Sequence, residues 1–131
     1  MKRGGLIAAL LALAVLVVAA TAGATRTVRI PSQVSIANHH GLHFTGRVSS
    51  PNRLCLFERQ VVLYRVIENG PDQALGREGT DDEGRWSIEV SGFAGISLSH
   101  FYARVQRRSE GTAGTIYVCR ADRSRTIELG R

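Results

Sequence analysis

Three histidines close together in the sequence are the first candidates for chemistry. His39, His40 and His43 form an H-H-x-x-H cluster. On a strand, His40 and His43 point to opposite faces, whereas in a loop the imidazoles could converge on zinc or copper. No second ligand pair with the fixed spacing of a structural zinc motif accompanies them. We therefore expect solvated loop histidines, and a small ligand or metal carrier is the alternative.

Arginine is the second residue type that could bind a ligand. Two groups of three arginines flank a predicted hairpin turn at residues 109–114. The first group is expected on one strand before the turn, and the second follows the next strand, so folding should bring the groups together at one end of the domain. Such positive charge suits an anionic polymer of the cell envelope, and a merely solubilising surface is the alternative. Nucleic acid is not expected, because aromatic residues do not alternate with the arginines. The candidates are Arg104, Arg107, Arg108, Arg120, Arg123 and Arg125.

Patterns of nucleophilic catalysis are missing from the sequence. The segment at residues 95–99, Gly-Ile-Ser-Leu-Ser, does not match the G-x-S-x-G pattern of hydrolases. The acidic residues at 81–83 cluster in one turn, without the spacing of a calcium loop. We therefore predict a protein without catalytic residues or cofactor, with a secreted enzyme or enzyme inhibitor as a further alternative.

The chain contains two cysteines, Cys55 and Cys119. In an oxidising compartment, an even pair in a small domain predicts a disulfide. The enclosed loop is long, so loop-closure entropy predicts a stabilisation of about 4 kcal/mol. A reactive or metal-binding thiol is the alternative, although neither cysteine lies in a C-x-x-C motif or near the histidines.

Residues 1–24 have the organisation of a secretory signal peptide. Lys2 and Arg3 precede an apolar run over residues 6–20, and small residues at 22–24 supply a cleavage site. We expect cleavage after residue 24 and a protein that is secreted or held in the cell envelope. In the alternative, the uncleaved segment is just long enough to anchor the chain in a membrane.

The remaining chain has the length of one domain. The 17 basic residues of the whole sequence outnumber the 11 acidic ones, and Lys2 is the only lysine. After the signal peptide, the excess of basic over acidic residues is therefore due to arginine alone. We expect an N-terminal extended segment at 25–41, at a sheet edge or partly loose, followed by one domain at 42–131.

A period of two in hydrophobicity runs through that domain and predicts strands with one buried face. Turn-forming residues fall between the apolar runs, near 49–53, 68–72, 80–84 and 109–114. About seven short strands separated by turns predict an all-β fold, a single antiparallel Ig-like or prealbumin-like β-sandwich. The clearest runs are Trp86, Ile88 and Val90; Phe101, Ala103 and Val105; Val61 to Ile67; Ile116 and Val118; and Ile127 and Leu129.

The segment at 80–88, Thr-Asp-Asp-Glu-Gly-Arg-Trp-Ser-Ile, resembles the T-D-x-x-G-x-aromatic-x-aliphatic signature of carboxypeptidase-regulatory-like domains. These belong to the wider prealbumin-like (transthyretin-like) group of β-sandwiches. Residues 44–48, 61–65 and 101–105 resemble the strands around that signature. The resemblance implies an accessory or binding module, and it implies that Gly84 adopts a positive φ and that Trp86 enters the core.

These observations together predict a secreted, non-enzymatic β-sandwich module that binds a partner or has a structural role at the cell surface. The expected partner is an anionic envelope polymer or another surface protein. Contact with a membrane is expected only through an uncleaved signal.

Overall fold

The computed structural model describes residues 24–91 and 99–129. Within these ranges the fold is all-β, with twelve strands, one short 3₁₀ helix and no α-helix. None of the described segments is a helix long and apolar enough to cross a membrane. The predicted signal peptide spans residues 1–24, and residues 1–23 lie outside the described ranges.

One sheet is built around β4 (His43–Ser49). Two short strands of the N-terminal segment pair with one edge of β4, and β7 (Arg85–Glu89) pairs with the other edge. The short strands are β2 (Gln33–Val34) and β3 (Ala37–Asn38). The N-terminal segment therefore lies at a sheet edge, as predicted, and it is built into the sheets instead of being loose.

The second sheet has β8 (His100–Val105) and β5 (Gln60–Arg65) at its centre. β6 (Gln73–Gly79) pairs with β5, with a bulge after Leu63. Two short strands, β11 (Asp122–Arg123) and β12 (Ile127–Glu128), pair with the free edge of β8.

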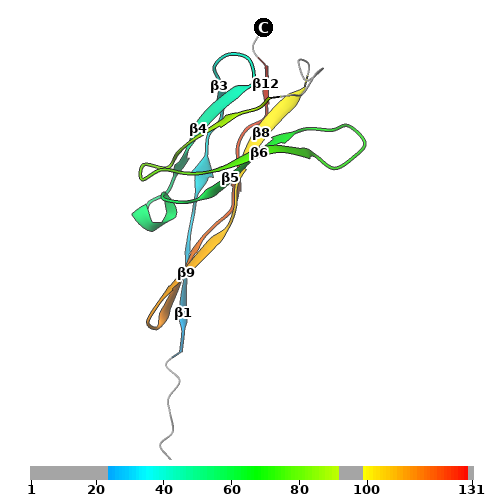
Figure 1. The fold of residues 1–131 in the computed structure, drawn as a ribbon. Helices are drawn as coiled ribbons and strands as arrows, with labels where there is room; N and C mark the ends of the chain where they lie inside the picture. The colour runs from blue at the N-terminus through cyan, green and yellow to red at the C-terminus, as the bar shows by residue number, and fades with distance from the viewer. Residues whose placement is uncertain (1–23, 92–98, 130–131) are drawn as a thin grey trace, which may run out of the picture.

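A third sheet projects from the body as an arm of β1 (Arg26–Ile30), β10 (Thr115–Cys119) and β9 (Arg108–Thr112) (Figure 1). The predicted hairpin is present as β9 and β10, but residues 108–112 belong to a strand and only Ala113 and Gly114 make the turn. β1 pairs with β10 in parallel, so the expectation of a purely antiparallel fold was wrong. The predicted runs did not include β6, β9 or β11, and the N-terminal segment divides into three strands.

Side chains from the two larger sheets meet in one core, and the alternating pattern is confirmed on both sides. On β7, Trp86 and Ile88 are buried while their neighbours Arg85, Ser87 and Glu89 are exposed. On β8, alternate residues again face inward. The core cluster includes Val34, Ile36, Phe44, Val48, Val61, Leu63, Trp86, Ile88, Val90, Phe101, Ala103 and Val105.

The turn before β7 aims Trp86 into this core. Gly84 has a φ of +82°, the left-handed conformation expected for that position, and its N–H donates to the carbonyl of Asp81 at 3.0 Å. One Oδ1 atom of Asp81 accepts from the backbone N–H groups of Glu83 and Arg85. The acidic turn thus has a local structural role, and these bonds hold the pKa of Asp81 below its usual value.

The predicted disulfide between Cys55 and Cys119 is confirmed, with 5.4 Å between the two Cα atoms. It links the 3₁₀ helix η1 (Arg53–Cys55) to the end of β10. Both cysteines pack with Ile30 in a second small core at the base of the arm, so the bond joins the arm to the body.

Candidate functional site

The outward face of the sheet formed by β11, β8, β5 and β6 carries a row of arginines. Directly opposite residues of antiparallel strands lie on one face. Val62 on β5 lies opposite Arg77 of β6 and opposite Arg104 of β8. Arg104 in turn lies opposite Arg123 of β11. The three arginines are exposed, and Val62 between them is fully buried.

Two stacked tyrosines form the next row on the same face. Tyr64 lies opposite Tyr102, and their rings stack at 5.2 Å with an angle of 17°. The guanidinium carbon of Arg123 lies 3.7 Å from the centre of the Tyr102 ring, which is cation–π geometry. We call the surface made by Tyr64, Arg77, Tyr102, Arg104 and Arg123 the arginine face.

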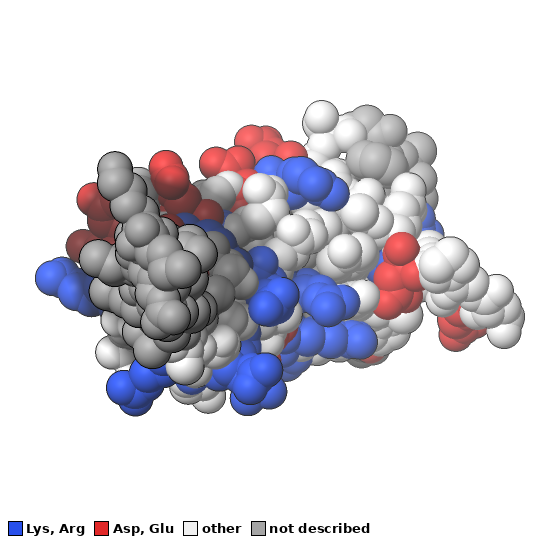
Figure 2. Space-filling model, turned by 90° about the horizontal axis from the view of Figure 1, so that it is seen from below, with Lys and Arg blue, Asp and Glu red and all other residues white. Residues whose placement is uncertain are grey.

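The charges of this face are not paired in salt bridges within the described part of the chain, although the Asp72 carboxylate lies near Arg123. No carboxylate there lies within 4.0 Å of a guanidinium nitrogen of Arg77, Arg104 or Arg123. Figure 2, seen from below, shows several arginine side chains close together, with acidic side chains both beside them and nearer the rim. The result is a concentrated positive surface on a rigid sheet.

A hydrogen bond between Tyr102 and Asp72 fixes the edge of the arginine face. The Tyr102 hydroxyl donates to Oδ2 of Asp72 at 2.6 Å. This bond, and a second from the Ile67 N–H, hold the pKa of Asp72 below its usual value. Burial of the ring and the bond to Asp72 raise the pKa of Tyr102 to about 12.

This pKa gives a testable pH dependence. The fold favours the protonated phenol of Tyr102, so its contribution to the free energy of unfolding is complete below pH 10. The contribution is lost as the pH rises from 10 to about 12. In an ultraviolet titration of the folded protein, we expect one of the three tyrosines to ionise near pH 12. Tyr102→Phe should remove that late step, and a late step that survives in this variant would contradict the assignment.

The six arginines predicted from the sequence have different roles. Arg104 and Arg123 come together as expected, but the prediction that Arg104, Arg107 and Arg108 share one strand was wrong. Arg108 belongs to β9, and Arg107 lies between the two strands. Arg107, Arg120 and Arg125 are exposed outside the strand register of the arginine face. Arg77 was not among the candidates predicted from the sequence. It belongs to the arginine face only because β6 pairs with β5 in a register that puts Arg77 opposite Val62.

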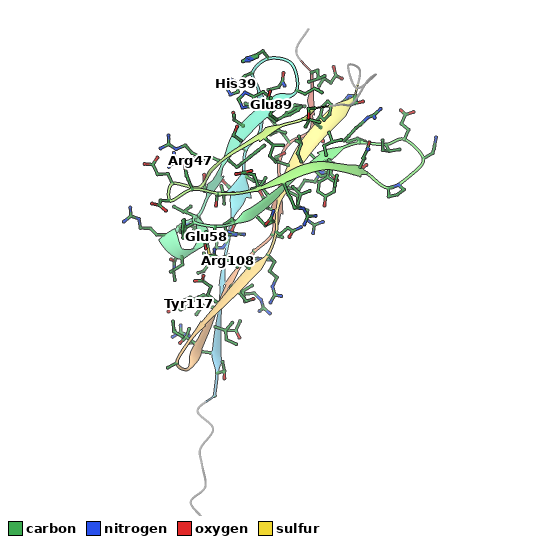
Figure 3. The ribbon with its side chains drawn as sticks, in the orientation of Figure 1. His39, Arg47, Glu58, Glu89, Arg108 and Tyr117 are labelled. Carbon is green, nitrogen blue, oxygen red and sulfur yellow. A yellow bond between two sulfur atoms is a disulfide. The ribbon has the colours of Figure 1, made fainter. Side chains whose placement is uncertain are left out.

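Arg108 serves the structure of the loop before β5. Its guanidinium donates to the carbonyl oxygens of Leu54 and Phe57 and contacts Glu110 at 3.2 Å. We therefore do not assign it to the arginine face. Figure 3 shows Arg108 beside the loop that carries Glu58, away from the outer end of the arm.

Arg59 is buried completely and was not identified from the sequence. Its Nη1 atom donates to Ser32 Oγ at 2.9 Å and to the Cys55 carbonyl at 2.8 Å. The Nη2 atom donates to the carbonyls of Gln106 at 2.9 Å and Arg120 at 3.0 Å. One side chain thus joins four segments. Burial, together with the nearby charge of Arg108, lowers its pKa to about 10, so it remains a cation at neutral pH.

His39 and His40 lie in the turn between β3 and β4, as expected for loop histidines, whereas His43 is the first residue of β4. The ring centre of His43 lies 5.8 Å from that of His39 and 6.0 Å from that of His40. Two of the rings already have partners: His39 Nε2 lies 2.6 Å from Thr45 Oγ1, and His43 Nε2 lies 2.8 Å from Ser87 Oγ. Across the described ranges, no three His, Cys, Asp or Glu side chains are placed to hold a metal ion.

Comparison with protein-family models gives no match, and comparison with curated proteins finds no significant similarity. The family resemblance of the segment at 80–88 therefore stays an expectation. The arginine face and the polar groups around the histidines are therefore the features of the molecule that point to a function.

Proposed function

We propose that this chain is a secreted, non-enzymatic binding module whose arginine face binds an anionic polymer of the cell envelope. Its fold is then a single β-sandwich of prealbumin-like type with an added arm. The shared core of the two larger sheets and the Gly84–Trp86 turn support the fold assignment. The Cys55–Cys119 bond supports export, since such bonds persist in oxidising compartments.

The observation that carries the proposal is the pairing of Arg104 with Arg123. Like charges directly opposite in a sheet are destabilising. Cation–π contact with Tyr102 compensates for part of this cost at Arg123, but Arg104 has no such contact among the described residues. A surface that keeps repelling charges together is suited to a ligand of opposite charge, such as a polyphosphate or polyuronate.

The proposal predicts salt-sensitive binding of an anionic polymer. With long-chain inorganic polyphosphate as the probe, we expect the Arg77→Gln/Arg104→Gln variant to bind roughly 2- to 30-fold more weakly. This range corresponds to about 0.2–1 kcal/mol for each exposed charge pair. Fluorescence anisotropy at increasing salt is the measurement, and binding should vanish at 1 M salt, where the Debye length is about 3 Å.

The matched control is Arg26→Gln/Arg53→Gln, which removes the same charge from two exposed arginines outside the face. It should bind polyphosphate nearly as well as the wild type. Equal losses in both double variants would mean that net charge alone drives binding. Binding that persists in 1 M salt would also contradict the proposal.

A further inference from the structure

A second surface, on the sheet of β4 and β7, has the features of a separate binding site. A hollow of about 630 Å³ opens there, between these strands, Ser35 and the end of β6. Thr45 of β4 and Ser87 of β7 contribute hydroxyl groups to it. Neither the fold nor the arginine face accounts for this hollow.

The floor of the hollow is Gly46, and no other residue fits there. A Cβ atom at Gly46 would lie 1.9 Å from the Ser35 carbonyl oxygen and 2.6 Å from Nε1 of Trp86. The missing side chain at Gly46 leaves room for the indole of Trp86 on the core side of the strand. Trp86 is only 3% exposed, and its Nε1 has no hydrogen-bond partner among the described residues. Because this atom is itself buried, the indole can report on changes at the floor of the hollow but does not offer a donor to a ligand there.

The hydroxyl groups at the hollow are already oriented. His39 holds Thr45 and His43 holds Ser87, through the 2.6 Å and 2.8 Å contacts between imidazole and hydroxyl. Each hydroxyl combines a donor with acceptor lone pairs, so one bond to an imidazole leaves capacity for a ligand. In Figure 3, His39 and Arg47 lie on this same side of the molecule. Polar groups fixed before binding reduce the entropy that a ligand must overcome.

The lining of the hollow carries as many acidic as basic side chains, Glu78 and Asp81 with Arg47 and Arg85. Arg85 contacts Asp81 at 3.6 Å and also pairs with Glu83. Nε of Arg47 donates to the Glu83 carbonyl at 3.0 Å. In contrast to the arginine face, this site therefore does not present an unpaired row of cations, and it suits a ligand without net charge.

We propose that the hollow binds a neutral polyhydroxylated ligand, a saccharide unit. A sugar offers several hydroxyl groups that can both donate and accept, which matches the oriented hydroxyls of Thr45 and Ser87. An apolar ligand would leave these groups without partners. The inference is independent of anion binding by the arginine face.

Trp86 is the only tryptophan, so its indole N–H gives one assignable signal in a ¹⁵N–¹H spectrum of the full chain. We would titrate the protein with glucose, galactose, N-acetylglucosamine and short neutral oligomers of each. At least one series should shift the indole signal saturably at millimolar concentration. Thr45→Val/Ser87→Ala should weaken that binding at least ten-fold, because two hydrogen bonds are lost. Ser87→Ala alone should have a smaller effect in the same direction.

Two control variants test whether the loss of saccharide binding is specific to the hollow. Ser109→Ala/Thr112→Val removes two exposed hydroxyls from β9 and should leave saccharide binding unchanged. Arg77→Gln/Arg104→Gln should also leave it unchanged, although that variant should bind polyphosphate more weakly. The absence of a saturable indole shift with every sugar of the panel would overturn the inference. A shift that is equally strong in Thr45→Val/Ser87→Ala would overturn it as well.

Discussion

Replacement of Arg59 by leucine should lower the free energy of unfolding by about 3–5 kcal/mol. Leucine fills part of the space, but it leaves Ser32 Oγ and three backbone carbonyls without their donor. Burial of the cation has its own cost, as the lowered pKa of Arg59 indicates. The loss of four charge-assisted hydrogen bonds, each contributing about 1.5–3 kcal/mol, outweighs the relief of that cost. Urea unfolding followed by Trp86 fluorescence measures the difference.

The matched control is Arg53→Leu, since Arg53 is an exposed arginine a few residues away in the same loop. Its free energy of unfolding should stay within about 0.5 kcal/mol of the wild type. Arg59→Lys keeps the charge but presents a single ammonium group, so it should lie between wild type and Arg59→Leu. If Arg59→Leu were as stable as the wild type, the four carbonyl and hydroxyl partners would not depend on the guanidinium.

Loss of the disulfide is the second large effect that we expect. The double variant Cys55→Ser/Cys119→Ser should unfold with a free energy lower by about 4 kcal/mol, within a range of about 2–5 kcal/mol. The bond constrains the unfolded chain, because 64 positions in the sequence separate the two cysteines. Urea unfolding with and without a reductant measures the effect in the wild type, where mass spectrometry should find no free thiol.

The disulfide and Arg59 should also be energetically coupled. The carbonyl that accepts from Arg59 Nη1 belongs to Cys55, so the position of that carbonyl depends on the bond. The triple variant that combines Arg59→Leu with both serines should therefore lose less than the sum of the separate effects. A coupling of about 0.5–3 kcal/mol is usual for groups in contact. Two reactive thiols in the native protein, or strict additivity, would contradict this account.

Local patterns predicted much of the fold. The alternation around Trp86 and Phe101 predicts which residues enter the core, because the side chains of a strand alternate between its two faces. A glycine before an aromatic residue predicts the turn at Gly84. Two cysteines in a small domain leave only one intramolecular pairing. In each case the information lies within a few residues or in a count, so the sequence carries it directly.

The features that could not be predicted from the sequence depend on contacts between segments that are distant in the chain. Parallel pairing of β1 with β10 joins Arg26 to Thr115, and no local pattern records that register. Arg59 stands between Glu58 and Gln60, so its immediate neighbours give no sign of burial. Only the fold surrounds its guanidinium with carbonyls. Arg77 likewise joins the arginine face through its register with Val62. The binding surfaces were therefore harder to predict than the core.

The parallel ladder between β1 and β10 also determines how the molecule carries a mechanical load. The described chain begins at the tip of the arm and ends beside β12, at the opposite end of the molecule (Figure 1). Tension between these ends pulls β1 from its start and β10 from its finish. The hydrogen bonds of the five residue pairs in the ladder are then loaded in shear and at the same time, so they do not break one after another. A module tethered at one end and bound to a polymer at the other would place this ladder directly in the line of force.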